Sequence, residues 1–228
     1  MTQALAPFGL SAAEFSEPGN STLRAAGYAF SIWGLLYLGM LVFAGFQALP
    51  GTPETKALAA FGWPAVIAMT GCGLWILAAA FNLQWASVVI ITGSALALIC
   101  AMLRVPPLSG RERWLVSLPL SLLAGWLTIA SVVNILTVLT MKDIITPEVA
   151  PMAALVGVGA ATVVALAVAY AAGSAAYLAP IAWGLVAVCV AEIDRKPEVA
   201  IASLGVAVML VIAGIAINRH RGDRTMIE

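Results

Sequence analysis

The feature that most constrains the fold is an uncharged apolar stretch, residues 25–49, which reads AAGYAFSIWGLLYLGMLVFAGFQAL. At 1.5 Å per residue, a helix of this length crosses a hydrocarbon core about 30 Å thick. Phe30, Trp33, Tyr37 and Met40 recur at intervals of three and four residues, so they share one face of that helix. Packing on a neighbouring helix is the simpler interpretation of this face, and contact with a ligand is the alternative.

The composition indicates that lipid surrounds much of the chain. Of its 228 residues, 62% are hydrophobic and 10% are charged, whereas soluble domains are about half apolar and about a quarter charged. The formal net charge is zero, so nothing favours a nucleic-acid partner or a basic anchor on a membrane surface.

Six further apolar segments follow the first, so the sequence predicts an all-α integral membrane protein with about seven transmembrane helices. The later segments cover about residues 61–81, 86–103, 114–141, 152–172 and 175–191, and the last ends near residue 217. We place Trp63 and Pro64 near the start of the second helix, where the missing N–H of a proline costs little.

The ends of the chain are polar. Residues 1–24 form either an ordered lid or a flexible tail, and they lack the pattern of a signal peptide; residues 218–228 are predicted to be a cationic tail. Lysine and arginine are more frequent in the loops on the side of the C-terminus. We therefore expect a bacterial inner (cytoplasmic) membrane, with the N-terminus outside and the C-terminus in the cytoplasm.

The fifth segment has small residues at every fourth position, which are Ala153, Gly157, Ala161, Ala165 and Ala169. Small side chains at this spacing let two helix backbones approach closely in lipid. The ridge indicates either close packing within the bundle or a contact with a second copy or a membrane-complex partner.

Several chemistries lack the residues that they need. Glu192 and Asp194 fall at the end of a span, where we expect them at the membrane interface, and no charge is predicted in the middle of a span. Proton pumps keep ionisable groups within the membrane, and retinal proteins need a buried lysine. The single histidine, His220, is in the tail, and the three cysteines are scattered. We therefore expect no metal, no required cofactor and no catalytic residue.

Aromatic and amide side chains remain as candidates for a binding site. Trp33 and Trp126 fall deep in their spans, and Trp126, Ala130 and Asn134 are four residues apart on one helical face. An apolar pocket with few polar groups is the usual form of a small-molecule site. The amides of Asn82 and Asn134 either bond to another helix or orient a polar group of a ligand.

Three blocks in this order resemble the tryptophan-rich sensory protein family, also known as the TspO/peripheral benzodiazepine receptor group. They are residues 27–37, GYAFSIWGLLY, followed by Gly39 and Met40; residues 77–85, with Asn82 and Trp85; and residues 113–134, with Leu118, Pro119, Trp126, Ala130 and Asn134. The resemblance covers about residues 25–140. It divides the chain into a TspO-like four-helix region, residues 25–141, and an additional three-helix region, residues 142–217.

The resemblance implies a helical bundle that binds flat apolar ligands such as porphyrin, haem or a sterol-like molecule. The pocket residues that it implies are Phe30, Trp33, Tyr37, Asn82, Trp85, Trp126, Ala130 and Asn134. The family has five helices, often forms a dimer, and has a helix before the aromatic span that is missing here. We therefore expect one of the additional C-terminal helices to fill that place.

The function expected on this basis is that of a membrane receptor or sensor. A transporter of a neutral or amphipathic solute, with hinges at Pro119 and Pro180, is one alternative. A structural subunit of a larger membrane complex is another, and enzymatic breakdown of porphyrin is a more remote one.

Overall fold

A computed structural model describes residues 9–49 and 55–225, with side chains up to residue 220, and all regular structure in these residues is helical. The helices are α1 (Ala12–Ser16), α2 (Ile32–Ala48), α3 (Lys56–Ala80), α4 (Gln84–Arg104), α5 (Gly110–Glu112), α6 (Leu118–Met141), α7 (Ala150–Ala172), α8 (Leu178–Glu192) and α9 (Pro197–Thr225). Turns of 3₁₀ helix cover Glu17–Ser21, Gly27–Ser31 and Ala175–Tyr177, and a π-helical turn covers Arg113–Ser117.

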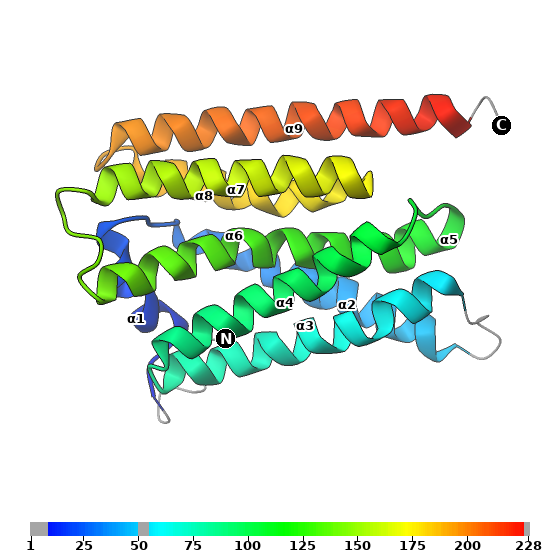
Figure 1. Cartoon of the computed structure of the whole chain (residues 1–228), viewed down its shortest axis with the longest axis horizontal. Helices are drawn as coiled ribbons and strands as arrows, with labels where there is room; N and C mark the ends of the chain where they lie inside the picture. The colour runs from blue at the N-terminus through cyan, green and yellow to red at the C-terminus, as the bar shows by residue number, and fades with distance from the viewer. Residues whose placement is uncertain (1–8, 50–54, 226–228) are drawn as a thin grey trace.

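Seven helical segments within the described residues are long and apolar enough to cross a membrane, which confirms the predicted number. They are Gly27–Ala48, Lys56–Ala80, Gln84–Arg104, Gly110–Met141, Ala150–Ala172, Ala175–Glu192 and Pro197–His220. All seven run along one axis of the molecule (Figure 1). The backbone of α9 continues as a helix to Thr225, through most of the segment predicted to be a cationic tail.

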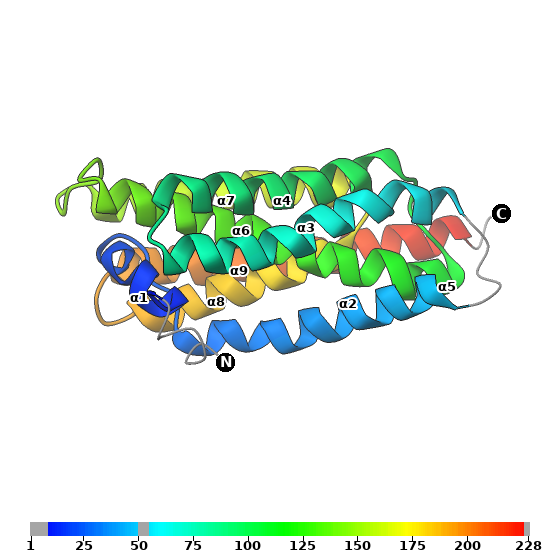
Figure 2. The ribbon, with the colours of Figure 1, turned by 90° about the horizontal axis from the view of Figure 1, so that it is seen from below.

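The centre of the bundle is α6, which packs against α2, α4, α7 and α8. Most of its side chains from Pro119 to Val138 are buried. Viewed from below, α2 and α7 lie at opposite edges of the bundle (Figure 2). The sequence dictates this arrangement only loosely, because every span is apolar around its whole circumference.

The bundle has two distinct ends (Figure 1). One carries the N-terminal residues 9–24, the turn between α3 and α4, and the loops at 142–149 and 193–196; we call residues 9–24 the lid and this end the lid end. The other carries α5, residues 173–175 and the last turns of α9, and we call it the far end.

The lid is ordered, which resolves the two interpretations of this segment for residues 9–24; residues 1–8 lie outside the described residues. A capping box starts α1: the Glu14 N–H donates to Ser11 Oγ at 3.2 Å and the Ser11 N–H donates to Glu14 Oε2 at 2.7 Å. Hydrogen bonding of the Glu14 carboxylate to the Ser11 side chain, and to the Ser11 backbone N–H, lowers the pKa of this carboxyl below its usual value. Phe15 is fully buried, edge-on to Trp75, with ring centroids 6.2 Å apart.

A buried carboxylate fastens the lid to the end of α8. Glu192 Oε1 accepts the Arg24 N–H at 2.8 Å, and Lys196 Nζ lies 3.5 Å from Glu192 Oε2 while donating to the Thr22 carbonyl at 2.6 Å. We expected Glu192 at the membrane interface; it does lie at the end of a span, but the lid and the α8–α9 loop enclose its side chain completely. The surrounding N–H and ammonium groups make burial of this charge tolerable.

The expectation for Pro64 was wrong. Helix α3 begins at Lys56, where Thr55 Oγ1 accepts the Leu58 N–H at 3.2 Å, so Pro64 lies in the helix interior and not in its first turn. Pro119 causes a different adjustment at the start of α6. The Leu118 N–H bonds to the Arg113 carbonyl, five residues back, and this π-helical turn leads into the proline, which has no N–H to continue the regular pattern.

The small-residue ridge of α7 faces the interior of the chain. Ala161, Ala165 and Ala169 are fully buried, and a Cβ added to Gly157 would come within 2.7 Å of Leu136 Cδ1 on α6. The ridge therefore serves close packing within the bundle. A contact of this ridge with a second copy or a membrane-complex partner stays a prediction.

Candidate functional site

A cavity of about 100 Å³ lies at the lid end, between the start of α2, the middle of α6, α8 and the lid. Five of the eight predicted pocket residues line it: Phe30, Trp33, Trp126, Ala130 and Asn134. Two segments, residues 27–33 and 126–134, supply these five, and residues 184–188 add further wall; the three segments are far apart in the sequence and meet because α2 and α8 both pack on α6.

Aromatic rings form one side of this cavity. The Trp33 and Trp126 rings are 6.1 Å apart at an interplanar angle of 83°, and Phe30 meets Trp126 at 6.4 Å and 80°. Tyr37 stacks on the outer side of this group, 5.4 Å from Trp33 and inclined by only 25°. Edge-to-face and offset-stacked arrangements are the ones that aromatic quadrupoles favour.

The aromatic group runs from the surface of the bundle into its interior. Trp126 is 6% exposed, whereas Phe30 and Tyr37 are each 47% exposed. A flat molecule arriving from the hydrocarbon region would meet Tyr37 and Phe30 first and then the edges of the two indoles.

The predicted aromatic face of the first span is divided. Met40 is buried with Leu36 and Phe43 in the core and does not line the cavity. The 3₁₀ turn at Gly27–Ser31 precedes the α-helix, so Phe30 departs from the register that extends back from Trp33 and Met40. Of the two interpretations of this face, packing in the core therefore applies to Met40, and a position at the cavity applies to Phe30 and Trp33.

Two polar groups in the cavity wall differ in how they are satisfied. Asn134 Nδ2 donates to Ser87 Oγ of α4 at 3.0 Å, so this amide does bond to another helix, one of its two predicted roles. The indole N–H of Trp75 is buried and has no hydrogen-bond partner among the described residues. An unpaired buried donor costs about 1–3 kcal/mol.

Three predicted pocket residues lie outside the cavity wall: Tyr37, Asn82 and Trp85. Asn82 forms the turn between α3 and α4 with a positive φ of 53°, a conformation that asparagine tolerates better than most residues. Its Oδ1 accepts from Gln84 Nε2 at 3.5 Å, at the exposed surface. Trp85, in the first turn of α4, is 51% exposed.

Part of the wall was not anticipated from the sequence. Trp75 of α3, Ile91 of α4 and Ile129 of α6 line the cavity, as do Gly184 and Val188 of α8. Phe15 of the lid contacts Trp75, and the Leu10 N–H donates to the Ala80 carbonyl at 3.0 Å, so the lid packs on α3. Neither Phe15 nor Trp75 belongs to the blocks that carried the resemblance.

Helix α8, one of the three additional spans, closes the cavity. The indole N–H of Trp183 donates to the Ala29 carbonyl at 3.1 Å, and the Ala26 N–H donates to the Ala187 carbonyl at 2.9 Å. These bonds hold the chain before α2 against α8. An additional helix therefore packs inside the bundle beside the aromatic span, as the hypothesis of a replacement helix requires.

The site is suited to apolar binding. The described residues that line it include no lysine, arginine, aspartate or glutamate, and its polar groups are an amide, hydroxyls and indole N–H groups. Such a wall can stack on a flat ring system and donate a hydrogen bond to its edge.

Comparison with known proteins identifies a family. A model of the family described as TSPO-like protein matches residues 1–216, which cover the lid, six of the spans and most of the seventh. No curated protein and no solved structure matches the chain. Since the match extends over nearly the whole chain, the chain is an integral membrane protein and belongs to the TSPO-like protein family.

Proposed function

We propose that the protein is a membrane receptor or sensor that binds a flat apolar ligand, such as a porphyrin or haem, at the aromatic cavity. The observation that carries the proposal is the perpendicular meeting of Trp33 on α2 with Trp126 on α6 at the wall of a cavity. Two large indoles with an unfilled space beside them have a free ring surface on which a planar ligand can stack.

The volume of the cavity decides how such a ligand is held. The cavity measures about 100 Å³, whereas sites that enclose a drug-sized ligand measure about 300–1,000 Å³. One edge of a tetrapyrrole therefore enters the cavity beside Trp33 and Trp126, while the rest lies over the exposed rings of Phe30 and Tyr37. Rotation of Phe30, which is half exposed, widens the entrance.

The indole N–H of Trp75 supports a ligand that carries an acceptor. This group is buried at the cavity wall without a partner among the described residues. A carboxylate or carbonyl on the inserted edge would accept its hydrogen bond and recover the cost of leaving it unpaired.

The proposal is tested with protoporphyrin IX and the protein in lipid nanodiscs, with quenching of tryptophan fluorescence as the readout. Replacing Trp33 by alanine removes one stacking surface and weakens binding about tenfold, equivalent to about 1.4 kcal/mol. Ala130→Phe fills the cavity and weakens binding at least as much. Trp63→Ala is the matched control, because Trp63 is 76% exposed and lies outside the cavity wall. Equal affinities of the Trp33 and Trp63 variants would contradict the proposal.

The orientation that we propose places the lid end outside the cell and the far end in the cytoplasm. Among the described side chains, the cations of the far end are Lys56, Arg104, Arg111, Arg113 and Arg219, against Arg24, Lys142, Arg195 and Lys196 at the lid end. An excess of cations marks the cytoplasmic side.

Labelling of intact cells by a membrane-impermeant maleimide tests this orientation. The background variant replaces Cys72, Cys100 and Cys189 by serine. We expect Glu148→Cys at the lid end to react in intact cells, and Arg104→Cys at the far end to react only after lysis. The reverse pattern would overturn the orientation.

A further inference from the structure

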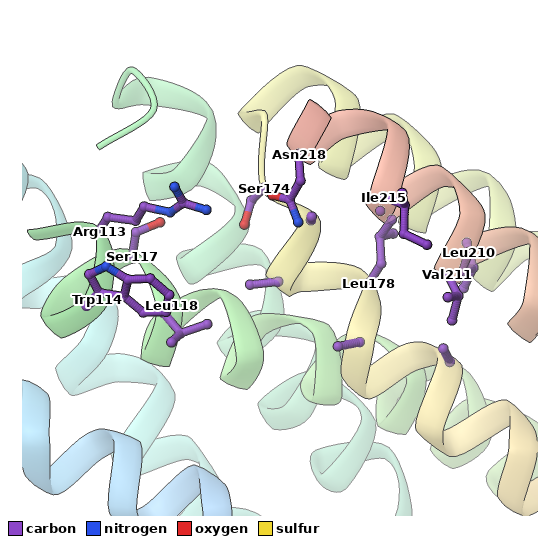
Figure 3. A pocket seen from close by; sticks show the side chains of 15 residues that line it. Arg113, Trp114, Ser117, Leu118, Ser174, Leu178, Leu210, Val211, Ile215 and Asn218 are labelled. Atoms are coloured by element: carbon purple, nitrogen blue, oxygen red, sulfur yellow. The ribbon is translucent and has the colours of Figure 1, made fainter. Parts of the chain in front are cut away.

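A second and larger cavity lies at the far end of the bundle. It measures about 400 Å³ and is bounded by the start of α6, the start of α8 and the last turns of α9 (Figure 3). It shares α6 and α8 with the aromatic cavity but none of its lining residues. We call it the far-end groove.

Small side chains create this groove. The 3₁₀ turn before α8 and α8 itself face α9 with Ala175, Ala179 and Ala182, and Gly214 on α9 has no side chain. A Cβ added to Gly214 would have only ordinary contacts, the nearest at 3.8 Å from Ala175, so close packing of the backbones does not require this glycine. Leu178, Leu210 and Val211 complete an apolar channel that runs along the helices.

The mouth of the groove is polar and cationic. Arg113 and Ser117 approach from the π-helical turn before α6, and Ser174 and Asn218 face them from the other side of the opening (Figure 3). The Arg113 guanidinium lies 5.5 Å from the ring centre of Trp114, and no carboxylate pairs with it among the described residues. The groove thus combines an unpaired cation at the interface with an apolar channel that runs toward the bilayer centre.

Positive charges outnumber negative ones among the described side chains of the far end. Arg104, Arg111 and Arg219 belong to the far end, and Glu112, the only carboxylate described there, hydrogen-bonds to Thr55 Oγ1. The first turns of α8 also begin at this end, and their N–H groups add positive potential. An anion at the mouth is therefore favoured over a neutral or cationic group.

We propose that the far-end groove binds a phospholipid with an anionic headgroup. Its phosphate pairs with the Arg113 guanidinium, Ser117 and Asn218 hydrogen-bond to the headgroup, and one acyl chain follows the channel between α8 and α9. The second acyl chain stays in the bilayer.

Selectivity in this site comes from the headgroup. An acyl chain that enters the groove leaves an equally apolar bilayer, so its transfer provides little hydrophobic stabilisation. Charge-assisted hydrogen bonds from a guanidinium to a phosphate are about twice as strong as neutral ones. Both kinds of headgroup present a phosphate to Arg113, but in a zwitterionic lipid an ammonium group balances the phosphate charge and is repelled by the cations of the far end. The groove should therefore discriminate anionic from zwitterionic lipid by the net charge of the headgroup, through Arg113, and should not discriminate between acyl chains.

The test uses the full-length protein reconstituted in bilayers with equal amounts of phosphatidylglycerol and phosphatidylcholine, extracted in mild detergent. Native mass spectrometry then measures the ratio of the two lipids that stay bound. We expect phosphatidylglycerol to be enriched about tenfold over the bulk ratio. Arg113→Ala should reduce the ratio to that of the bulk, and Arg113→Lys should retain part of the enrichment.

Matched controls separate the contribution of the headgroup contacts to lipid binding from that of the acyl-chain channel. Arg104→Ala removes a far-end cation that does not line the groove and should lower the ratio far less than Arg113→Ala does. Ala179→Phe fills the channel and should reduce retention of both lipids, whereas Val208→Phe on the exposed side of α9 should not. Unchanged enrichment in Arg113→Ala would overturn the proposal. Displacement of the bound lipid by millimolar glycerol phosphate would also overturn it, because it would assign the mouth to a soluble phosphate compound.

Discussion

The aromatic cavity and the far-end groove are built on the same two helices by opposite means. The cavity is walled by indole and phenyl rings, and no charged side chain is among the described residues that line it. The groove is walled by alanine, glycine and branched aliphatic residues, and it carries Arg113 at its mouth. Large rings leave a cavity because they cannot fill the space around their edges, whereas small side chains leave a groove because they do not reach across it.

The difference shows how depth in the membrane selects the chemistry of a site. The groove opens at the interface, where a guanidinium keeps contact with water, and so it can select by charge. The walls of the aromatic cavity come from the lid, the start of the first span and the interior of the later spans, and they offer hydrogen bonds and ring contacts without an ion. Between the two sites, Gly125 of α6 packs directly on the carbonyl of Tyr177, and the Tyr177 hydroxyl lies 2.7 Å from Thr128 Oγ1.

Among the variants that test the difference between the two sites, we expect the largest effect, a loss of stability, from a change at Glu192. Glu192→Ala leaves the Arg24 N–H and the Lys196 ammonium without their buried partner. Because Lys196 is partly solvated, we expect a loss of about 2–3 kcal/mol, less than for a fully enclosed pair. Thermal unfolding in detergent, followed by tryptophan fluorescence, should show the decrease. Glu198→Ala, an exposed change in the first turn of α9, is the control.

The same variant should separate the two sites. Loss of Glu192 loosens the lid, which supplies Ala12 and Ser16 to the aromatic cavity and nothing to the groove. Porphyrin affinity should change while enrichment of phosphatidylglycerol does not. A change in lipid enrichment as large as that in porphyrin binding would show that the two ends are coupled.

Gly125→Ala should disturb both sites together. An added Cβ would lie 2.1 Å from the Tyr177 carbonyl oxygen, so α6 and the start of α8 must move apart. Overpacking of this kind costs about 1–3 kcal/mol. Both fluorescence quenching by porphyrin and retention of anionic lipid should decrease. Gly93→Ala, at a helical position where a Cβ meets nothing within 4 Å, is the control.

A change in one site should have only a small effect on binding at the other site. Arg113→Ala should change porphyrin affinity by less than about twofold, and Trp33→Ala should change the lipid ratio as little, because sites without shared partners behave additively within about 0.5 kcal/mol. A larger crossed effect would mean that α6 transmits a displacement from one end to the other.

The sequence was sufficient for the spans and for part of the aromatic cavity. Uncharged runs of about 20 residues identify membrane helices because the bilayer core provides no partners for backbone groups. Trp33 and Trp126 were identified because their depth and spacing depend on their own helices alone. Asn82 was assigned to the pocket from its place in a motif, but its positive φ makes it a turn residue, which only the path of the chain between α3 and α4 reveals.

The rest of the wall of the aromatic cavity, and the far-end groove, depend on contacts that leave no pattern in an apolar sequence. Helix α8 joins the site partly through the carbonyls of Ala29 and Ala187, and a backbone acceptor has no residue signature. The far-end groove results from alanines and a glycine that the sequence does not distinguish from those of the α7 ridge. Which small residues touch a neighbour and which leave space is decided by the packing of the helices.

The smallest effect concerns the capping box of the lid. The pKa of Glu14 is lowered in the folded lid by its hydrogen bonds with Ser11, so the contribution of Glu14 is complete at neutral pH and is lost as the pH falls through that lowered value. Glu14→Gln should make amide exchange in residues 11–17 slightly faster at pH 7. Below pH 4.5, the usual pKa of glutamate, the variant should lose the part of the pH dependence of this exchange that the Glu14 carboxyl causes. Amides in the middle of α4, corrected for intrinsic exchange, are the reference. An identical pH dependence in both proteins would show that the carboxylate does not hold the lid, and that Glu192 and the burial of Phe15 fix this end of the cavity without it.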